Sequence, residues 1–461
     1  MKKQKRLGSE NVGKLLMEFS VPAIIGMLIN VLYNIVDRIF IGKGVGAIAI
    51  SAVGLTLPFS TIIMAFGMLA GIGGAALISI RLGEGKHDEA EKILGNTFVL
   101  LSIISILVTV VGIGFLDPLL RIFGASEITF GYAKDYIIII LVGAVFNAVG
   151  FGLNASIRSD GSPKTAMITN LIGAITNIIL DYVFIMKMDM GIKGAAIATV
   201  IGQTLNTIWV LRYFMIGNSS SMKLKVKNMK LDINIVKGIF AIGMSPFLIQ
   251  IAASVVNVLA NNTLKANGGD YAIGAMSILI SITMIFLMPV FGITQGAQPI
   301  LGYNYGAVKI DRVKKCLMLA ICSASTLCII GFVFVEVFPS FMISIFSDDE
   351  NILMIGTRGL QIFLCMIPVI GFQIVVSNFF QAIGKAKISI ILSLSRQVII
   401  LIPMLIILPK LFGLKGVWIA YPISDFLSSL ITLVFLIKEL KAMSAKEKNE
   451  KNINMNKIIE I

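Results

Sequence analysis

The apolar runs of this chain limit its possible folds more than any other feature. About twelve stretches are long enough to cross a hydrocarbon core of roughly 30 Å as helices. They lie at 16–40, 52–79, 94–115, 132–156, 165–186, 195–214, 236–262, 272–301, 316–338, 354–381, 388–408 and 414–437. Membrane strands alternate in polarity and run only about ten residues, so this continuity excludes a barrel. With 57% hydrophobic residues, we predict an all-α, polytopic membrane protein with 12 transmembrane helices.

The second half of the sequence repeats the first. Matching positions lie about 223 residues apart: Pro22 and Pro246, Gly73 and Gly296, Lys86 and Lys309, Asp88 and Asp311, Lys92 and Lys315, and Gly161 and Gly384. Two fused half-units are typical of secondary transporters. We therefore predict two homologous six-helix lobes. The predicted division is an N-terminal cytoplasmic segment (1–14), an N-lobe (15–216), a cytoplasmic linker (217–235), a C-lobe (236–438) and a cytoplasmic tail (439–461) whose last twenty residues are disordered.

The basic residues predict the orientation. The chain has 39 Lys and Arg against 25 Asp and Glu, and most of the cations fall in loops on the side of the N-terminus. The positive-inside rule then places both termini in the cytoplasm, with the chain in the cytoplasmic membrane. The net charge of +14 is explained by this topology and by contact with anionic membrane lipids. We therefore expect no nucleic-acid partner.

Several functional classes are disfavoured. The sequence has no Walker-type phosphate loop, so ATP does not drive it directly. His87, the sole histidine, lies in a polar loop, and no nucleophile with a neighbouring base is present, which argues against an enzyme. We expect no cofactor beyond a coupling ion.

Two carboxylates deep in apolar spans carry the strongest functional signal. A charge near the middle of a membrane costs at least a few kcal/mol unless it is paired, hydrated or protonated. At 1.5 Å per residue, Asp37 and Asp181 both reach the outer half of the bilayer and could share one cavity. Asn177 precedes Asp181 by four residues and lies on the same helix face.

The chemistry of such a pair leaves two coupling ions open. Two nearby carboxylates repel each other when both are ionised, so the pair can bind and release a proton. Alternatively, oxygen atoms of Asp37, Asn177, Asp181 and Thr199 could surround a hard cation such as Na⁺.

The second half offers different polar residues. Its spans carry amides such as Gln250 and Gln373 and no central carboxylate. Arg396 and Asp425 are exceptions that could pair with each other across two spans. Pro22 and Pro246 occupy equivalent places near the cytoplasmic ends of two helices, where a hinge and an ordinary first-turn proline are both consistent with the sequence.

These residues resemble the multidrug and toxic compound extrusion (MATE) family, and most closely its branch of DNA-damage-inducible proteins and Gram-positive multidrug exporters. The resemblance covers about 10–440. It rests on the twelve spans and on these residues: Pro22, Tyr33, Asn34, Asp37, Asn154, the stretch 158–164, Asn177, Asp181 and Thr199. It implies a MATE-like fold and the following roles: Asp37 and Asp181 as coupling carboxylates, Asn177 and Thr199 as their polar partners, Tyr33, Asn34 and Asn154 as a surrounding network, and Pro22 as a hinge.

We therefore expect a secondary antiporter that exports cationic, amphipathic organic compounds in exchange for H⁺ or Na⁺ by alternating access, acting as a monomer. The alternative is a lipid-linked oligosaccharide or polysaccharide flippase of the same superfamily. That activity would favour a more cationic central cavity.

Overall fold

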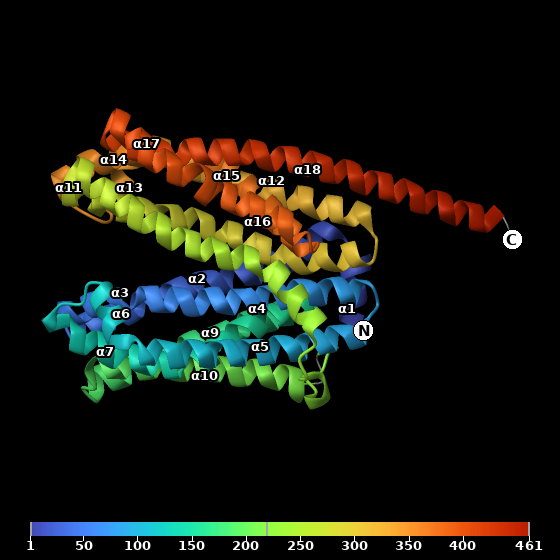
Figure 1. Cartoon of the computed structure of the whole chain (residues 1–461), viewed down its shortest axis with the longest axis horizontal. Coiled ribbons are helices and arrows are strands. Elements are labelled where there is room, and N and C mark those ends of the chain that lie inside the picture. The colour runs from blue at the N-terminus through green and yellow to red at the C-terminus, as the bar shows by residue number, and fades with distance from the viewer. Residues whose placement is uncertain (1, 218–219, 460–461) are drawn as a thin grey trace. The chain divides into compact units, whose positions relative to one another are not determined.

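The computed structural model describes residues 2–217 and 220–459, which form helices and no β-strand (Figure 1). The predicted all-α class is confirmed. Parts of three predicted regions lie outside the described residues, namely residue 1 of the N-terminal segment, 218–219 of the linker and 460–461 of the tail.

The chain separates into two compact units. The first contains the residues up to Arg6 together with Glu18–Ile251, and the second contains Leu7–Met17 together with the chain from Ala252 onward. The chain changes unit after Arg6, after Met17 and after Ile251, each time inside a helix, whereas the predicted lobes divide at the linker 217–235.

The first half of the sequence forms ten α-helices, a π-helical turn (η1) and a 3₁₀ turn (η2). Their bounds are α1 (Lys2–Ser9), α2 (Val12–Gly44), α3 (Ala47–Leu55), α4 (Leu57–Gly83), α5 (His87–Gly114), α6 (Leu116–Ile122), α7 (Glu127–Val142), α8 (Ala144–Ser159), α9 (Pro163–Asp181), η1 (Tyr182–Lys187), α10 (Gly191–Met215) and η2 (Val226–Asn228).

The second half follows a similar order. Its elements are α11 (Ile233–Gly306), α12 (Ile310–Val337), α13 (Pro339–Ser344), α14 (Glu350–Leu364), α15 (Ile367–Ala382), α16 (Ala386–Leu394), the π-helical η3 (Ser395–Leu401), α17 (Ile402–Phe412) and α18 (Leu414–Ile459).

Among the described residues, nine helices are long and apolar enough to cross a membrane, and up to eleven if each of two bent helix pairs is one span. The 74-residue α11 has non-helical backbone at Gly269, where two helices meet at a kink. A multi-pass membrane protein is therefore established, while the count of twelve spans stays a prediction.

Local geometry repeats along with the sequence. Helices α7 and α8 meet at a bend of 53°, and their counterparts α14 and α15 at 49°. Lys86 and Lys309 precede α5 and α12 with the same dihedral angles, φ −89° and ψ 68°. The residue before each lysine has positive φ: Gly85 at 77° in one half and Val308 at 57° in the other. Glycine adopts this conformation freely and a β-branched residue rarely does. The loop before α12 therefore has the same shape as the loop before α5, although Val308 stands where the first half has Gly85.

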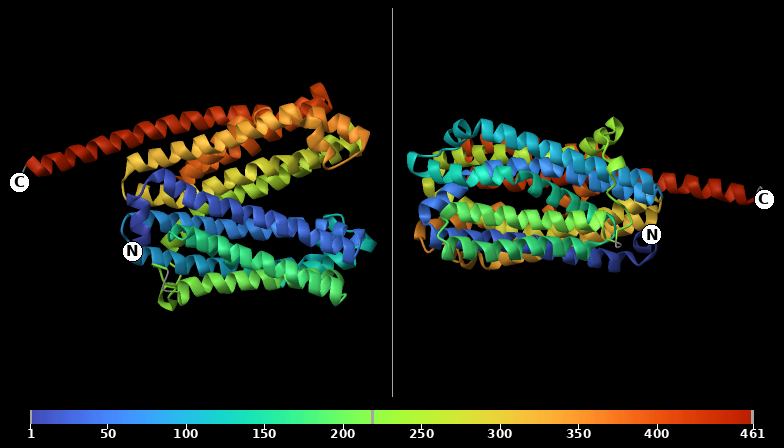
Figure 2. Two further views of the ribbon diagram at one scale, coloured as in Figure 1. Left: turned by 180° about the vertical axis from the view of Figure 1, so that it is seen from behind. Right: turned by 90° about the horizontal axis from the view of Figure 1, so that it is seen from below.

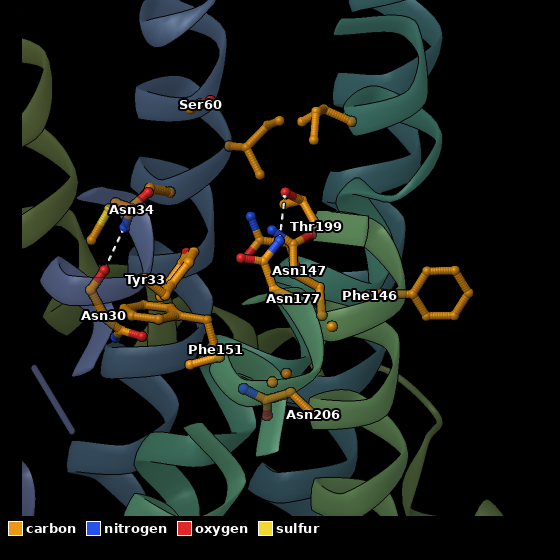
Figure 3. Close-up of a pocket in the computed structure, with 18 of the residues that line it drawn as sticks. Asn30, Tyr33, Asn34, Ser60, Phe146, Asn147, Phe151, Asn177, Thr199 and Asn206 are labelled. Atoms are coloured by element: carbon orange, nitrogen blue, oxygen red, sulfur yellow. Dashed lines mark hydrogen bonds between the residues drawn. The ribbon is translucent and has the colours of Figure 1, made fainter. Parts of the chain in front are cut away.

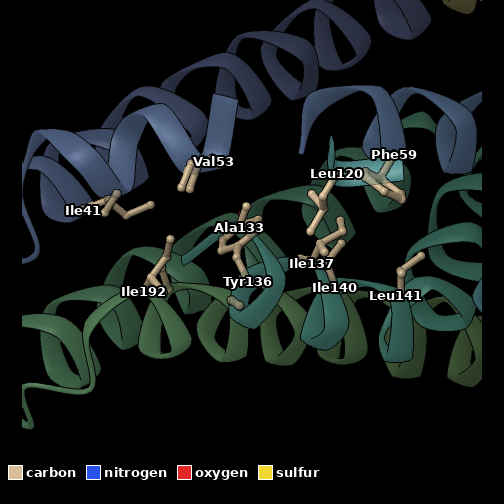
Figure 4. Packing of buried hydrophobic residues seen from close by; sticks show 14 of the residues in the cluster. Ile41, Val53, Phe59, Leu120, Ala133, Tyr136, Ile137, Ile140, Leu141 and Ile192 are labelled. Carbon is tan, nitrogen blue, oxygen red and sulfur yellow. The ribbon is translucent and has the colours of Figure 1, made fainter. Parts of the chain in front are cut away.

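An apolar cluster fills one end of the first unit (Figure 4). It joins the end of α2 to α3, α6, α7 and the start of α10 through residues such as Ile41, Val53, Leu120, Ile137 and Ile192. Its members are almost fully buried, and inside a membrane such packing is stabilised by van der Waals contact rather than by transfer from water. This end of the unit is therefore closed by packed hydrocarbon.

Glycines bring the helices of this unit into close contact. A Cβ atom on Gly71 would lie 2.3 Å from the Cα of Gly152, and one on Gly73 would lie 2.2 Å from the carbonyl oxygen of Ile239. Small residues that let backbones approach are typical of membrane helix packing.

The tail differs from its prediction. The last twenty residues were expected to be disordered, but α18 continues as one helix to Ile459 and extends past the other helices of its unit (Figures 1 and 2). Lys, Glu and Asn dominate this stretch without proline, and Lys and Glu are good helix formers.

Candidate functional site

A cavity of about 350 Å³ lies inside the first unit, between α2, α4, α7, α8, α9 and α10 (Figure 3). Seven carboxamide side chains contribute to its wall: Asn30, Asn34, Asn147, Asn170, Asn177, Gln203 and Asn206. Ile63, Tyr136 and Ile140 belong both to this wall and to the apolar cluster. The cavity therefore ends where the packed hydrocarbon begins.

The two predicted carboxylates meet beside this cavity. Asp37 lines it and is 7% exposed, whereas Asp181 is not among the lining residues and has no exposed surface. Their carboxyl groups are within hydrogen-bonding reach of each other. A hydrogen bond between them requires a proton on one of the two, since an ionised carboxylate only accepts.

Buried oxygens around this pair have no donor. No group among the described residues donates a hydrogen bond to Asp37 Oδ1, to either carboxylate oxygen of Asp181 or to Asn177 Oδ1. Buried polar atoms nearly always have a partner, so unpaired acceptors need an explanation. Four acceptors at one place, two of them on carboxylates, are the arrangement that a proton or a hard cation would complete.

Asn177 and Thr199 form the neighbouring part of the site. Asn177 Nδ2 donates to Thr199 Oγ1 over 3.3 Å, which leaves the amide oxygen of Asn177 free to accept. Tyr136 is within hydrogen-bonding reach of Thr199. Figure 3 shows Asn177 and Thr199 on the side of the cavity opposite Tyr33 and Asn34.

The other predicted residues lie in different places. Tyr33 and Asn34 line the cavity, and Asn34 Nδ2 donates to the carbonyl oxygen of Asn30 over 2.6 Å. Pro22 lies inside the uninterrupted helix α2. Asn154 does not line the cavity.

Asn154 instead organises a separate buried cluster. Its Nδ2 donates to the carbonyl oxygen of Ala166 over 2.8 Å and to Thr169 Oγ1, and its Oδ1 accepts from Arg158. The expectation that it surrounds the carboxylates is therefore not supported by its contacts, which join α8 to the first turn of α9.

Sequence reasoning missed Tyr136 and most of the carboxamides. Neutral amides in an apolar helix are inconspicuous one at a time, but their spacing carries a signal. Residues 30, 34 and 37 on α2, 170, 174 and 177 on α9, and 199, 203 and 206 on α10 all line the cavity. Steps of three, four and seven place residues on one face of a helix.

Comparison with known proteins identifies the relationship. The MatE family model matches residues 22–183 and 241–407, which is most of the chain and covers each half separately. The chain belongs to the MatE family.

The relatives of this MatE protein match it over nearly its whole length. Multidrug export protein MepA of Staphylococcus haemolyticus is 29% identical over 425 residues, covering 91% of this chain and 93% of MepA. MepA of Staphylococcus aureus strain MSSA476 is 29% identical over 441 residues, covering 95% and 96%.

Solved structures have the same fold. One is the MATE multidrug transporter DinF-BH in complex with R6G, with a TM-score of 0.86, 39% identity, and coverage of 93% of this chain and 97% of that one. Another is an outward-facing conformation of a multidrug resistance MATE family transporter, with a TM-score of 0.91, 23% identity, and coverage of 96% and 99%. The predicted MATE-like fold is confirmed, and the chain is a membrane transporter rather than a member of an enzyme family.

The second unit of this MatE protein has a different polar centre. Arg396 Nε donates to Asp425 Oδ1 over 2.5 Å, and the carboxylate side chain is only 3% exposed. Arg396 lies in the π-helical η3 and Asp425 in α18. The pair that the sequence left open is formed.

Proposed function

We propose that this protein is a secondary active multidrug antiporter of the cytoplasmic membrane. It exports cationic, amphipathic organic compounds in exchange for H⁺ or Na⁺ by alternating access, with both termini in the cytoplasm. The relatives named as multidrug export proteins and the DinF-BH complex with R6G support the substrate class.

One observation carries the coupling step: two buried carboxyl groups lie within hydrogen-bonding reach of each other beside a cavity, and Asp37 Oδ1 and both carboxylate oxygens of Asp181 have no donor among the described residues. In the ionised state the two negative charges repel each other in a medium of low dielectric constant. Binding of a proton or a Na⁺ ion removes that repulsion. The occupied site and the empty site therefore stabilise different conformations of the protein. A difference in affinity between two conformations is what allows an ion to shift their populations.

The charge of the cavity supports a cationic cargo. Asp37 is the one charged residue among the described residues that line it. A lipid-linked pyrophosphate would need positive groups, and no Lys, Arg or His is on this wall. The flippase alternative is thus not favoured. Inward movement of one charge through about 100 mV supplies roughly 2.3 kcal/mol for export.

The test uses the purified protein in proteoliposomes with R6G as cargo. A pH gradient and a sodium gradient are imposed in separate experiments, and R6G movement is followed by fluorescence. We expect uphill R6G transport with at least one gradient, and the gradient that works identifies the ion. Absence of transport with both would reject the antiport proposal.

Asp37→Asn is the matched variant. It keeps the size of the side chain and removes its charge, so we expect no gradient-driven R6G transport with normal membrane insertion. Asp117→Asn is the control, because Asp117 is half exposed and pairs with Lys134 outside the cavity. Normal transport by Asp37→Asn would remove Asp37 from the coupling step.

A further inference from the structure

Two short segments outside the cavity occupy the same position in the repeat. Leu7–Glu10 precedes α2, and residues 220–232 precede α11. Each is held by a helix from the other half of the sequence: the first segment by the start of α12, the second by the start of α5. Each set of contacts lies within a single compact unit.

The contacts of the first segment are donated by side chains around the start of α12. They are Asn304 Nδ2 to Leu7 O (2.9 Å), Lys309 Nζ to Gly8 O (2.7 Å), and Arg312 Nη2 to Leu7 O (3.0 Å) and to Glu10 O (2.6 Å). Arg312 Nε also donates to Asn304 Oδ1 over 2.9 Å, which fixes the two donors together. The accepting carbonyls lie at the C-terminal end of α1, where a helix leaves unpaired carbonyls and a partial negative charge. We call this set the α12 clasp.

The second segment is held by two buried side chains of α5, Glu91 and Asn96. Glu91 accepts from Lys223 N (2.9 Å), Lys225 Nζ (2.6 Å) and Asn228 Nδ2 (3.4 Å). Asn96 donates to Lys230 O (3.2 Å) and accepts from Asp232 N (2.8 Å). Glu91 is 8% exposed and Asn96 is 1% exposed. We call this set the α5 clasp.

The clasps explain why the unit boundaries fall inside helices. Because the linker residues 223–232 are bound to α5, the linker belongs to the first unit. Because Leu7–Glu10 is bound to α12, the segment Leu7–Met17 belongs to the second, whereas the residues up to Arg6 belong to the first. The chain therefore passes between the units at three places: Arg6–Leu7 within α1, Met17–Glu18 within α2 and Ile251–Ala252 within α11.

We propose that the two clasps form a conformational device that confines relative movement of the units to the three crossings in α1, α2 and α11 and so couples ion capture to transport. The argument rests on the proposed antiport function. Helix α2 contains both a unit boundary and Asp37, and runs from Val12 to Gly44 without interruption. With its start held by α12, a change at Asp37 is transmitted along α2 to the second unit. With its start released, the same change moves α2 alone.

Arg312→Gln tests the α12 clasp. It removes the donors to Leu7 and Glu10 while leaving the cavity unaltered. We expect unchanged R6G binding in detergent, gradient-driven R6G efflux lower by roughly tenfold or more, and faster hydrogen exchange at the backbone amides of 7–17. Exchange at 220–232 should stay as in the wild type. Lys315→Gln is the control, since it removes one positive charge from an exposed position on the same helix.

Glu91→Gln tests the α5 clasp independently and serves if Arg312→Gln does not fold. We expect faster exchange at 220–232, unchanged exchange at 7–17, and the same loss of efflux with binding retained. The proposal is overturned if loosened segments leave efflux at the wild-type level, if exchange does not change, or if binding is lost together with efflux. Failure of the antiport function would appear separately, as absence of ion-driven efflux in the wild type.

Discussion

The two halves of this protein place opposite kinds of polar centre in similar helical surroundings. In the first unit, Asp37 and Asp181 are two neighbouring acids, and neither forms an ion pair with a basic side chain among the described residues. In the second, Asp425 has Arg396 at 2.5 Å. The two charges of an ion pair neutralise each other, whereas two buried carboxylates need a proton or a cation from outside the protein to neutralise their charge. Under the proposed antiport function, the acid pair of the first half therefore has to exchange an ion, whereas the ion pair of the second half does not.

The largest expected effect concerns transport. Asp181→Asn should reduce gradient-driven R6G efflux to background, because one acid alone no longer forms the proton-sharing pair. The measurement is R6G efflux from proteoliposomes that is driven by an imposed pH or sodium gradient. Asp135→Asn is the control, because the Asp135 side chain is about half exposed. If Asp181→Asn transported R6G at the wild-type rate, the acid pair of the first half would not be required for transport, and the proposed difference between the two halves would be wrong.

The same substitution in the second half should act on stability. Asp425→Asn leaves the Arg396 charge in the membrane without its counter-ion, at a cost of about 3–5 kcal/mol. Thermal unfolding in detergent would show this loss. The double variant Arg396→Met with Asp425→Leu should recover most of the stability and keep efflux; lost efflux in a stable double variant would show that the ion pair takes part in transport.

A smaller effect of opposite sign is expected for the stability of Asp181→Asn. Removing one of two adjacent negative charges relieves repulsion, so the variant should be as stable as the wild type or more stable by on the order of 1 kcal/mol. The gain should grow as pH rises and the wild-type pair loses its shared proton. A clear loss of stability would mean that the pair is structural.

The smallest effect is expected at an exposed cluster outside the spans. Burial acts to raise the pKa of Glu84, but hydrogen bonds from Arg81 and Lys86 outweigh it and hold the pKa below its ordinary value. Its stabilisation is therefore present above the ordinary pKa and lost as pH falls through the lowered one. Glu84→Gln should cost at most about 0.5 kcal/mol at neutral pH, measured by thermal unfolding. The equivalent position in the second half is Ala307, so this network belongs to one half alone.

The sequence alone predicted the helical class, the duplication and the central acids, because charge in an apolar span is conspicuous. It did not predict that Asn154 would turn toward Arg158, because helix periodicity gives a face but not the partner across it. The π-helical turns at Tyr182–Lys187 and Ser395–Leu401 were also missed, since a π-helical turn widens a helix without a distinctive composition. The α12 clasp and the α5 clasp depend on contacts between positions some 130 to 300 residues apart. A local sequence pattern does not predict such contacts.

The apolar cluster at the end of the cavity also serves as electrical insulation. Ile63, Tyr136 and Ile140 face the ion site on one side and packed hydrocarbon on the other. A bare ion entering that packing would lose its water shell at a cost of several kcal/mol. Under the proposed antiport cycle, this packed end therefore insulates the site on the side of the cluster.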